Sequence, residues 1–316
     1  MAHVQDAAAG LATPDRPGRQ GAGLSDRWFS IFLIAPAMAV ILVFALLPLF
    51  YALDVSFRFA DLTRGAVGDY VGLDNYRTVF NNPTFWETSF TTLRFTVVAV
   101  GLQMTLGIAI AFLLHSVTVA RGITRSLIIL PLATSAAVTG LFWRYMYDTQ
   151  FGIINWALGS VGLPEPNWLG DFNIALWSVI LFDVWQWTPF VALIALVGLQ
   201  ALPKEPFEAA ELDGASRWRV LTTLTFPLLK PVLFLVVVLR TIDCLRLYDA
   251  VAVLTRGGPG TSTETMTFYL HRTGLSVFRM DYASTMAIFF LYVVIVAAVF
   301  ALAPLLKQFT DRAKEA

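Results

Sequence analysis

The sequence predicts an all-α membrane protein with six transmembrane helices. Hydrophobic residues make up 57% of the chain and charged residues only 14%, whereas soluble domains carry about 25% charged residues. The apolar residues also gather in six long runs. Each run approaches the roughly 20 residues that a helix needs to cross a hydrocarbon core about 30 Å thick. A surface that faces lipid explains both features.

The six runs follow a polar N-terminal stretch. Residues 1–27 are rich in Gly, Ala and Pro without an apolar period, so they are expected to be a disordered tail. The first run is longer than the 7–15 apolar residues, approximately, of a signal peptide, and it is expected to remain as the first span. The expected spans are Trp28–Leu53, Phe95–Leu114, Ser126–Trp143, Phe172–Leu199, Pro231–Leu254 and Tyr282–Leu306.

The distribution of basic residues predicts the orientation. Six spans bring both termini to one side of the membrane, and an excess of Lys and Arg marks the cytoplasmic side. The lysines, Lys204, Lys230, Lys307 and Lys314, all fall on the side of the termini, whereas the arginines are found on both sides. We therefore expect a multi-pass protein with both termini in the cytoplasm.

Several kinds of function are disfavoured by what the sequence lacks. The phosphate-binding pattern GxxxxGK[ST] is absent, so the energy for any pumping has to come from another subunit. Cys244 is the single cysteine, and His3, His115 and His271 are not spaced as metal ligands. The net charge of zero gives no basic face for nucleic acid. The chain is expected to be no enzyme and to bind no metal, cofactor or nucleic acid.

The loop between the fourth and fifth spans, residues 204–231, carries helix signals. Pro206 suits a first helical turn, and Gly214 permits a sharp turn between two short helices. The residues expected to form one apolar face are Phe207, Ala210, Leu212 and Trp218. Such an amphipathic unit either docks a soluble partner or lies on lipid. The acidic stretch 205–213 would be repelled by anionic lipid, but the residues alone leave both interpretations open.

This loop resembles the EAA loop of binding-protein-dependent ABC importer permeases. The family pattern is EAA, three residues, Gly, nine residues and then Ile-x-Leu-Pro. Here Glu208-Ala209-Ala210 and Gly214 match, and Leu224-Thr225-Phe226-Pro227 replaces the usual Ile and Leu by Leu and Phe. The segments Tyr70–Tyr76 and Leu254–Gly260 are similar to the maltose-type sugar permeases, the carbohydrate uptake transporter 1 group. The C-terminus lacks the glycine-rich ending of one of the two permease types in that group.

The resemblance implies a type I ABC importer permease fold with a cytoplasmic EAA coupling-helix loop. It implies a heterodimer with a second permease, two ATPase subunits that bind ATP and Mg, and an extracellular or periplasmic solute-binding protein. The solute would be a carbohydrate or polyol crossing the bacterial cytoplasmic membrane, with lipid around the chain. The residues implied to contact the ATPase are Glu208, Ala209, Ala210, Asp213 and Gly214.

The expected spans and the EAA loop divide the chain into four regions. Residues 1–27 form the expected cytoplasmic tail, and 28–87 the first span with its outer loop. Residues 88–306 form the permease core, which includes the EAA loop, and 307–316 form a second cytoplasmic tail.

Charged residues interrupt two of the expected spans. Arg240, Asp243, Arg246 and Asp249 recur every three residues with alternating sign, so they are expected to pair along one helix. In a helix over 232–254, Asp243 would lie near the bilayer centre, where a bare charge costs at least about 2.5–3.5 kcal/mol. These side chains should therefore face the interior of the bundle or a wet cavity.

Sugars bind to hydrogen-bonding groups and flat aromatic faces, and the interrupted spans supply both. The candidate residues of a solute pathway are Asp183, Gln186, Trp187, Thr188, Arg240, Asp243 and Tyr248. The alternative is that the charges are structural ion pairs and the aromatic residues only pack. A different class of function, an ion-coupled secondary transporter using Asp183 and Asp243, would leave the EAA loop unexplained. A membrane-embedded glycosyl transferase is disfavoured because the loops show no DxD-like or His-rich cluster.

Overall fold

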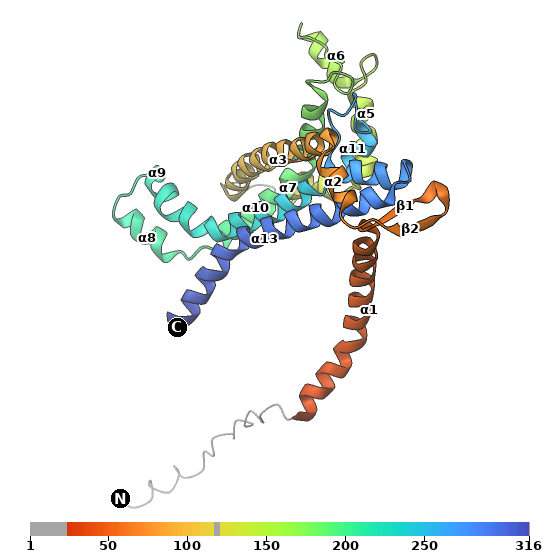
Figure 1. The fold of residues 1–316 in the computed structure, drawn as a ribbon. Coiled ribbons are helices and arrows are strands. Elements are labelled where there is room, and N and C mark those ends of the chain that lie inside the picture. The colour runs from red at the N-terminus through yellow and green to blue at the C-terminus, as the bar shows by residue number, and fades with distance from the viewer. Residues whose placement is uncertain (1–23, 117–120, 316) are drawn as a thin grey trace, which may run out of the picture. The chain divides into compact units, whose positions relative to one another are not determined.

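A computed structural model describes residues 24–116 and 121–315, which are mostly helical (Figure 1). The chain divides into two compact units, Met1–Tyr51 and Ala52–Ala316. What is described of the first unit is most of helix α1, Leu24–Ser56, which contains Pro36 and Pro48. The expected N-terminal tail lies outside the described residues, except for 24–27, which begin α1.

The described residues contain five continuous helices long and apolar enough to cross a membrane. These helices are Ile31–Ser56 within α1, α3 (Pro83–Ser116), α7 (Ala175–Gln200), Arg217–Leu245, and Met280–Val299 within α13 (Met280–Glu315). The remaining expected span is a bent pair. With this pair, the predicted architecture of six spans is confirmed. Helix α13 continues through most of the expected C-terminal tail.

The expected third span, Ser126–Trp143, is not one straight helix. It consists of α4 (Arg121–Ile129), the 3₁₀ turn η2 (Leu130–Ala133) and α5 (Ala136–Met146), with an angle of 95° between the two arms. Pro131 lies at the bend. Because proline has no N–H and its ring clashes with the preceding turn, an α-helix cannot run straight through this position.

The expected fifth span, Pro231–Leu254, is wrong at both ends. The helix begins at Arg217 with α9 (Arg217–Val220) and continues through the π-helical turn η3 (Leu221–Thr225) into α10 (Phe226–Leu245). Proline at position 231 suggests a helix start. In the structure Pro231 instead lies inside α10, and Pro227 lies in its first turn, after α9 and η3. The helix ends at Leu245, and α11 (Asp249–Leu254) begins after a short break.

Helices α3, α7 and α10 pack against one another and form the core of the second unit. A Cβ at Gly107 of α3 would lie 2.6 Å from the Val191 side chain of α7, so only glycine permits this close approach. One buried cluster surrounds Phe95 and Phe182 and includes Cys244, and another surrounds Leu196 and Leu229.

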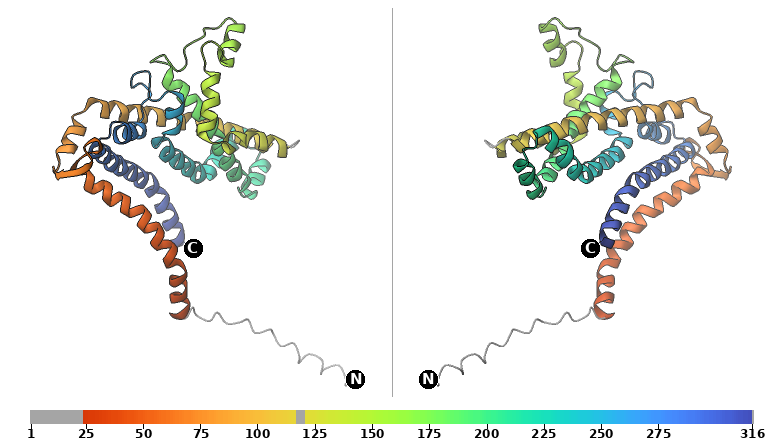
Figure 2. Two further views of the ribbon diagram at one scale, coloured as in Figure 1. Left: turned by 90° about the vertical axis from the view of Figure 1, so that its right-hand side faces the viewer. Right: turned by 90° about the vertical axis from the view of Figure 1, so that its left-hand side faces the viewer.

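The short elements lie at opposite ends of this bundle (Figures 1 and 2). Helix α8 (Glu205–Leu212) and α9 lie at one end, here called the α8 end. The other end, called the hairpin end, carries β1 (Arg58–Asp61), the 3₁₀ turn η1 (Leu62–Arg64), β2 (Ala66–Tyr70) and α2 (Asp74–Phe80). Strands β1 and β2 are antiparallel. Helix α6 (Ile153–Ser160) projects from the bundle. Helix α12 (Met266–His271) and the π-helical turn η4 (Arg272–Ser276) come directly before α13 in the chain.

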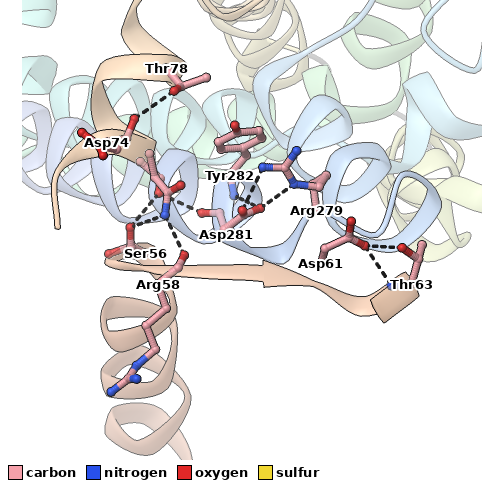
Figure 3. Close-up of polar contacts among 11 residues, drawn as sticks. Ser56, Arg58, Asp61, Thr63, Asp74, Thr78, Arg279, Asp281 and Tyr282 are labelled. Carbon is pink, nitrogen blue, oxygen red and sulfur yellow. Dashed lines mark hydrogen bonds and ion pairs between the residues drawn. The ribbon is translucent and has the colours of Figure 1, made fainter. Parts of the chain in front are cut away.

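The start of α13 is tied to the hairpin by its backbone: the Leu62 N–H donates to the Phe278 carbonyl at 2.9 Å, and Asp61 forms an antiparallel bridge with Arg279. A buried carboxylate then holds the Arg279 side chain (Figure 3). Asp281 is fully buried and accepts hydrogen bonds from Arg279 Nε at 3.0 Å and Nη2 at 2.9 Å. This hydrogen bonding raises the pKa of Arg279 above its ordinary value. The guanidinium also stacks 3.8 Å from the ring centre of Tyr282. Asn75 of α2 donates to the Ser56 and Arg58 carbonyls, which fixes the start of the hairpin.

Replacing Asp281 should loosen the hairpin end. In Asp281→Ala, Arg279 loses two charge-assisted hydrogen bonds, which are each worth about 1.5–3 kcal/mol. We expect a clearly lower melting temperature of the detergent-purified chain in a fluorescence unfolding assay. The matched control is Arg77→Ala, because the Asp74–Arg77 pair is largely exposed and such pairs contribute about 0–1 kcal/mol. Equal melting temperatures of the two variants would contradict this view of Asp281.

Candidate solute cavity and coupling surface

The interior of the bundle holds a buried arginine. Arg240 of α10 is 1% exposed. Its Nη2 lies 3.1 Å from Asp183 Oδ2 of α7, and its Nε donates to Gln103 Oε1 of α3 at 2.9 Å. Gln103 Nε2 donates in turn to Asp183 Oδ2 at 2.6 Å. The three core helices are therefore joined by one charged, mutually hydrogen-bonded triad.

The remaining contacts of Arg240 reach the edge of a cavity. Nη1 donates to Asp243 Oδ2 at 3.3 Å, and the guanidinium carbon lies 4.5 Å from the ring centre of Trp187. The Asp243 side chain is 52% exposed, in contrast to Asp183. All three guanidinium nitrogens of Arg240 already have protein partners, so its role is to hold the wall of the cavity together.

The cavity has a volume of about 280 Å³ and is lined by residues of α5, α7, α10 and α11 and of the break between the last two. Six of the seven sequence-predicted pathway residues line it: Asp183, Gln186, Trp187, Arg240, Asp243 and Tyr248. Among the described residues, Gln186 Oε1 is buried without a hydrogen-bond partner. This acceptor is enclosed and unused, and the residue that carries it lines the cavity.

Thr188 does not belong with the other six. It is not among the lining residues, and its hydroxyl donates to the Val184 carbonyl one turn earlier in α7. Neighbouring helix positions differ by about 100° in direction, so the residue after Trp187 faces another side. The proximity of Thr188 to the aromatic pair in sequence is misleading.

The expected ladder of four paired charges forms only in its first step. Arg240 and Asp243 are one turn apart on α10 and in contact. The helix then ends at Leu245, so Arg246 and Asp249 leave the helical register and line the cavity as exposed side chains. Asp243 consequently lies near the end of its helix, not at the middle of a helix over 232–254.

Sequence reasoning missed Gln103, which completes the buried triad. The available signal is that Gln103 is a lone amide within the uncharged run Phe95–Leu114. A buried amide requires hydrogen-bond partners, but the sequence does not say on which helix they lie. The roles of Arg246 and Asp249 at the cavity also depend on the helix break, which no glycine or proline announces.

The EAA loop forms two short helices with the sharp turn that the sequence predicts. Gly214 has a φ of +67°, in the left-handed region that disfavours a side chain. The N–H of Ala215 donates to the Ala210 carbonyl at 2.9 Å, which closes the end of α8. Ser216 then caps α9 by accepting from the Arg219 N–H.

The five residues implied to contact an ATPase line two separate surfaces. Ala209, Ala210, Asp213 and Gly214 line a groove of about 610 Å³ between α8 and the start of α9. Glu208 instead lines a second groove of about 580 Å³, with Phe207 and the ends of α3 and α7. The loop therefore presents different residues on its two sides.

The expected common apolar face of this loop is wrong. Phe207 and Ala210 are half-buried, but Leu212 is 90% exposed and Trp218 is 73% exposed. Gly214 turns the chain between these two side chains, so α8 and α9 do not continue one face. Two large apolar side chains are thereby left at the surface of the α8 end.

The comparisons with known proteins identify the family. Residues 103–315 match the model of the binding-protein-dependent transport system inner membrane component. The chain belongs to this family. It is a multi-pass membrane permease subunit of an ABC importer, a class of subunit that has no ATPase motif of its own.

Individual relatives cover most of the chain. It is 39% identical over 234 residues, 74% of this chain and 79% of the relative, to a trehalose/maltose transport system permease of Thermococcus litoralis. A sulfoquinovosyl glycerol transport system permease of Agrobacterium fabrum is 31% identical, with 84% and 86% covered. The fold matches a crystal structure of a bacterial alginate ABC transporter with a TM-score of 0.77, at 21% identity, over 88% of this chain and 93% of that chain.

Breaking the buried triad should destabilise the permease. In Asp183→Leu, Arg240 remains buried without its carboxylate, a loss that typically costs about 3–5 kcal/mol. We expect poor recovery of folded protein and a lowered melting temperature. The double variant Asp183→Leu with Arg240→Met removes both charges and should recover much of the loss. If the double variant is as unstable as the two single variants combined, the ion pair is not the source of the effect.

Proposed function

We propose that this chain is one of two different permease subunits of an importer that moves a carbohydrate or a related polyol across the bacterial cytoplasmic membrane. In this proposal, an extracellular or periplasmic binding protein delivers the solute. Two ATPase subunits, which bind ATP and Mg, act on the EAA loop. The observation that carries the proposal is the polar and aromatic cavity beside the buried triad, in a chain whose relatives are named as sugar permeases.

The chemistry of the cavity suits a polyhydroxylated solute. Gln186 has an enclosed acceptor that is unused within the described residues, Asp243 keeps one carboxylate oxygen without a partner there, and Tyr248 supplies a hydroxyl. Trp187 adds an aromatic ring to the lining, with the Arg240 guanidinium over one of its faces. The volume of about 280 Å³ is just below the range of about 300–1,000 Å³ for small-molecule sites. A second permease would complete such a site.

The orientation follows from the distribution of basic residues along the chain. Lys204, Lys230, Arg217 and Arg219 belong to the α8 end, which is therefore proposed to face the cytoplasm. Helix α13 runs from the hairpin end toward the α8 end, so the C-terminus lies on the same proposed side (Figure 1). The hairpin end then faces outward, where the binding protein arrives.

The proposed contact with the ATPase is formed by Glu208, Ala209, Ala210, Asp213 and Gly214. Exposed Leu212 and Trp218 extend this surface with the apolar area that a protein partner covers. Exposed large apolar residues rimmed by charged ones are typical of protein interaction sites. Helix α9 continues through η3 into α10, so a push on the loop would be transmitted along a helix that reaches the cavity.

Replacing Gly214 should uncouple the permease from its ATPase. In Gly214→Val, a β-branched side chain is forced into the left-handed region, at a cost of about 1–2 kcal/mol, and the turn between α8 and α9 changes. We expect loss of ATPase co-purification and of uptake. The matched control is Gly65→Val, because Gly65 also has a positive φ and open space around it, but lies in the turn of the hairpin. Intact ATPase binding in Gly214→Val would overturn the proposed contact.

Uptake into proteoliposomes that contain the complete transporter tests the solute class. We expect ATP-dependent uptake of radiolabelled trehalose or maltose that a protonophore does not abolish. Gln186→Leu, which removes the free acceptor, should raise KM by about three- to ten-fold, the range of one hydrogen bond. Thr188→Val, a change of similar size next to the cavity residues, should leave KM unchanged. Uptake driven by a proton gradient without ATP would instead favour an ion-coupled carrier.

A further inference from the structure

Helix α12 supports the segment that presents Tyr248 to the cavity. Its N-cap residue Thr265 and its side chains at positions 268 and 271, spaced by three residues, all contact the break between α10 and α11. Thr265 Oγ1 donates to the Leu247 carbonyl at 2.8 Å. Phe268 stacks on the Tyr248 ring with centres 5.9 Å apart, and the His271 ring centre lies 4.7 Å from the same ring.

Helix α12 is itself firmly anchored. The Met266 N–H donates to Thr92 Oγ1 of α3 at 2.8 Å, and Asn82 Nδ2 donates to the Tyr269 hydroxyl at 3.2 Å. Both carboxylate oxygens of buried Glu264 lie within 3.0 Å of the Arg272 guanidinium. Burial raises the pKa of Glu264, and Arg272 opposes that rise. An element held from two sides in this way can fix the position of what it contacts.

The Tyr248 hydroxyl has a hydrogen-bond partner outside the cavity. It lies 3.2 Å from His271 Nε2, and either group can donate, depending on the histidine tautomer. Within the described residues this is the single hydrogen bond of that hydroxyl. Tyr248 lines the cavity, whereas His271 does not. His271 therefore acts on the cavity only through Tyr248.

We propose that His271 is a positioning residue that holds the Tyr248 side chain in one orientation at the cavity wall and thereby sets the affinity for the solute. This inference rests on the proposed function of the cavity. The phenol can rotate about its side-chain torsions, and a fixed partner removes that freedom before the solute binds. Such preorganisation lowers the entropic cost of binding. The aromatic contact with Phe268 fixes the plane of the ring, and the contact with His271 fixes the direction of the hydroxyl.

Uptake kinetics of the complete transporter test the proposal, with radiolabelled trehalose and maltose as probes. His271→Phe keeps a ring beside Tyr248 but removes the hydrogen bond, so KM should rise by about three- to ten-fold. The maximal rate should stay near that of the wild type, because the coupling surface is untouched. His271→Gln, which can still hydrogen-bond to the hydroxyl, should recover most of the affinity. Ser276→Ala is an exposed control in the same segment.

A double-mutant cycle separates an effect through Tyr248 from a general one. Tyr248→Phe removes the hydroxyl and should itself raise KM. In that background His271→Phe should add nothing, because coupled residues are not additive. Independent, additive increases in KM would overturn the role of His271 as a positioning residue.

A measurement without solute keeps the inference testable when the solute class is wrong. Tetranitromethane nitrates exposed phenols, and mass spectrometry of the purified complex reports the rate at each tyrosine. Nitration of Tyr248 should accelerate several-fold in His271→Phe and not in His271→Gln, with exposed Tyr145 as an internal control. An unchanged rate at Tyr248 would overturn the inference. Absent uptake of both sugars by the wild type would overturn only the proposed solute class.

Discussion

The structure depends on the pairing of one buried guanidinium. Arg240 cannot leave the interior of the bundle, and an ion of this size without partners costs several kcal/mol in an apolar medium. Asp183 supplies the opposite charge, Gln103 accepts from Nε and Asp243 accepts from Nη1. Three helices far apart in sequence, α3, α7 and α10, therefore have to meet at one point. The packing of α3 against α7, which only glycine permits at position 107, is compatible with that meeting point.

The same pairing gives the cavity its character. Because the nitrogens of Arg240 are hydrogen-bonded to protein groups, the other polar side chains of the lining remain to meet a solute. They are Gln186, Asp243, Arg246, Tyr248 and Asp249. The helix break after Leu245 turns Tyr248 toward the cavity, and Thr265 satisfies the carbonyl that the break exposes. A solute site of the proposed kind is therefore supported by the buried triad of Arg240, Asp183 and Gln103, and its lining consists of hydrogen-bonding side chains.

Function at the two ends of the bundle requires opposite physical properties. At the hairpin end, backbone contacts of Asp61 with Arg279 and of Leu62 with Phe278 fix the start of α13 against the hairpin, and buried Asp281 holds the Arg279 side chain. At the α8 end, Leu212 and Trp218 remain exposed on two short helices joined at Gly214. In the proposed function, the partner ATPase covers this surface.

The sequence by itself determined the membrane class, the six spans, the family and the turn at Gly214, because these depend on local apolar length and local backbone freedom. It also singled out six residues that share the cavity, since charges and aromatic groups inside spans are conspicuous. Only the tertiary structure decided that Gln103 joins Asp183 and Arg240, that Thr188 faces elsewhere and that the charge ladder stops after one step. These outcomes depend on contacts between distant segments, such as that of Thr265 with Leu247, and no local pattern encodes them.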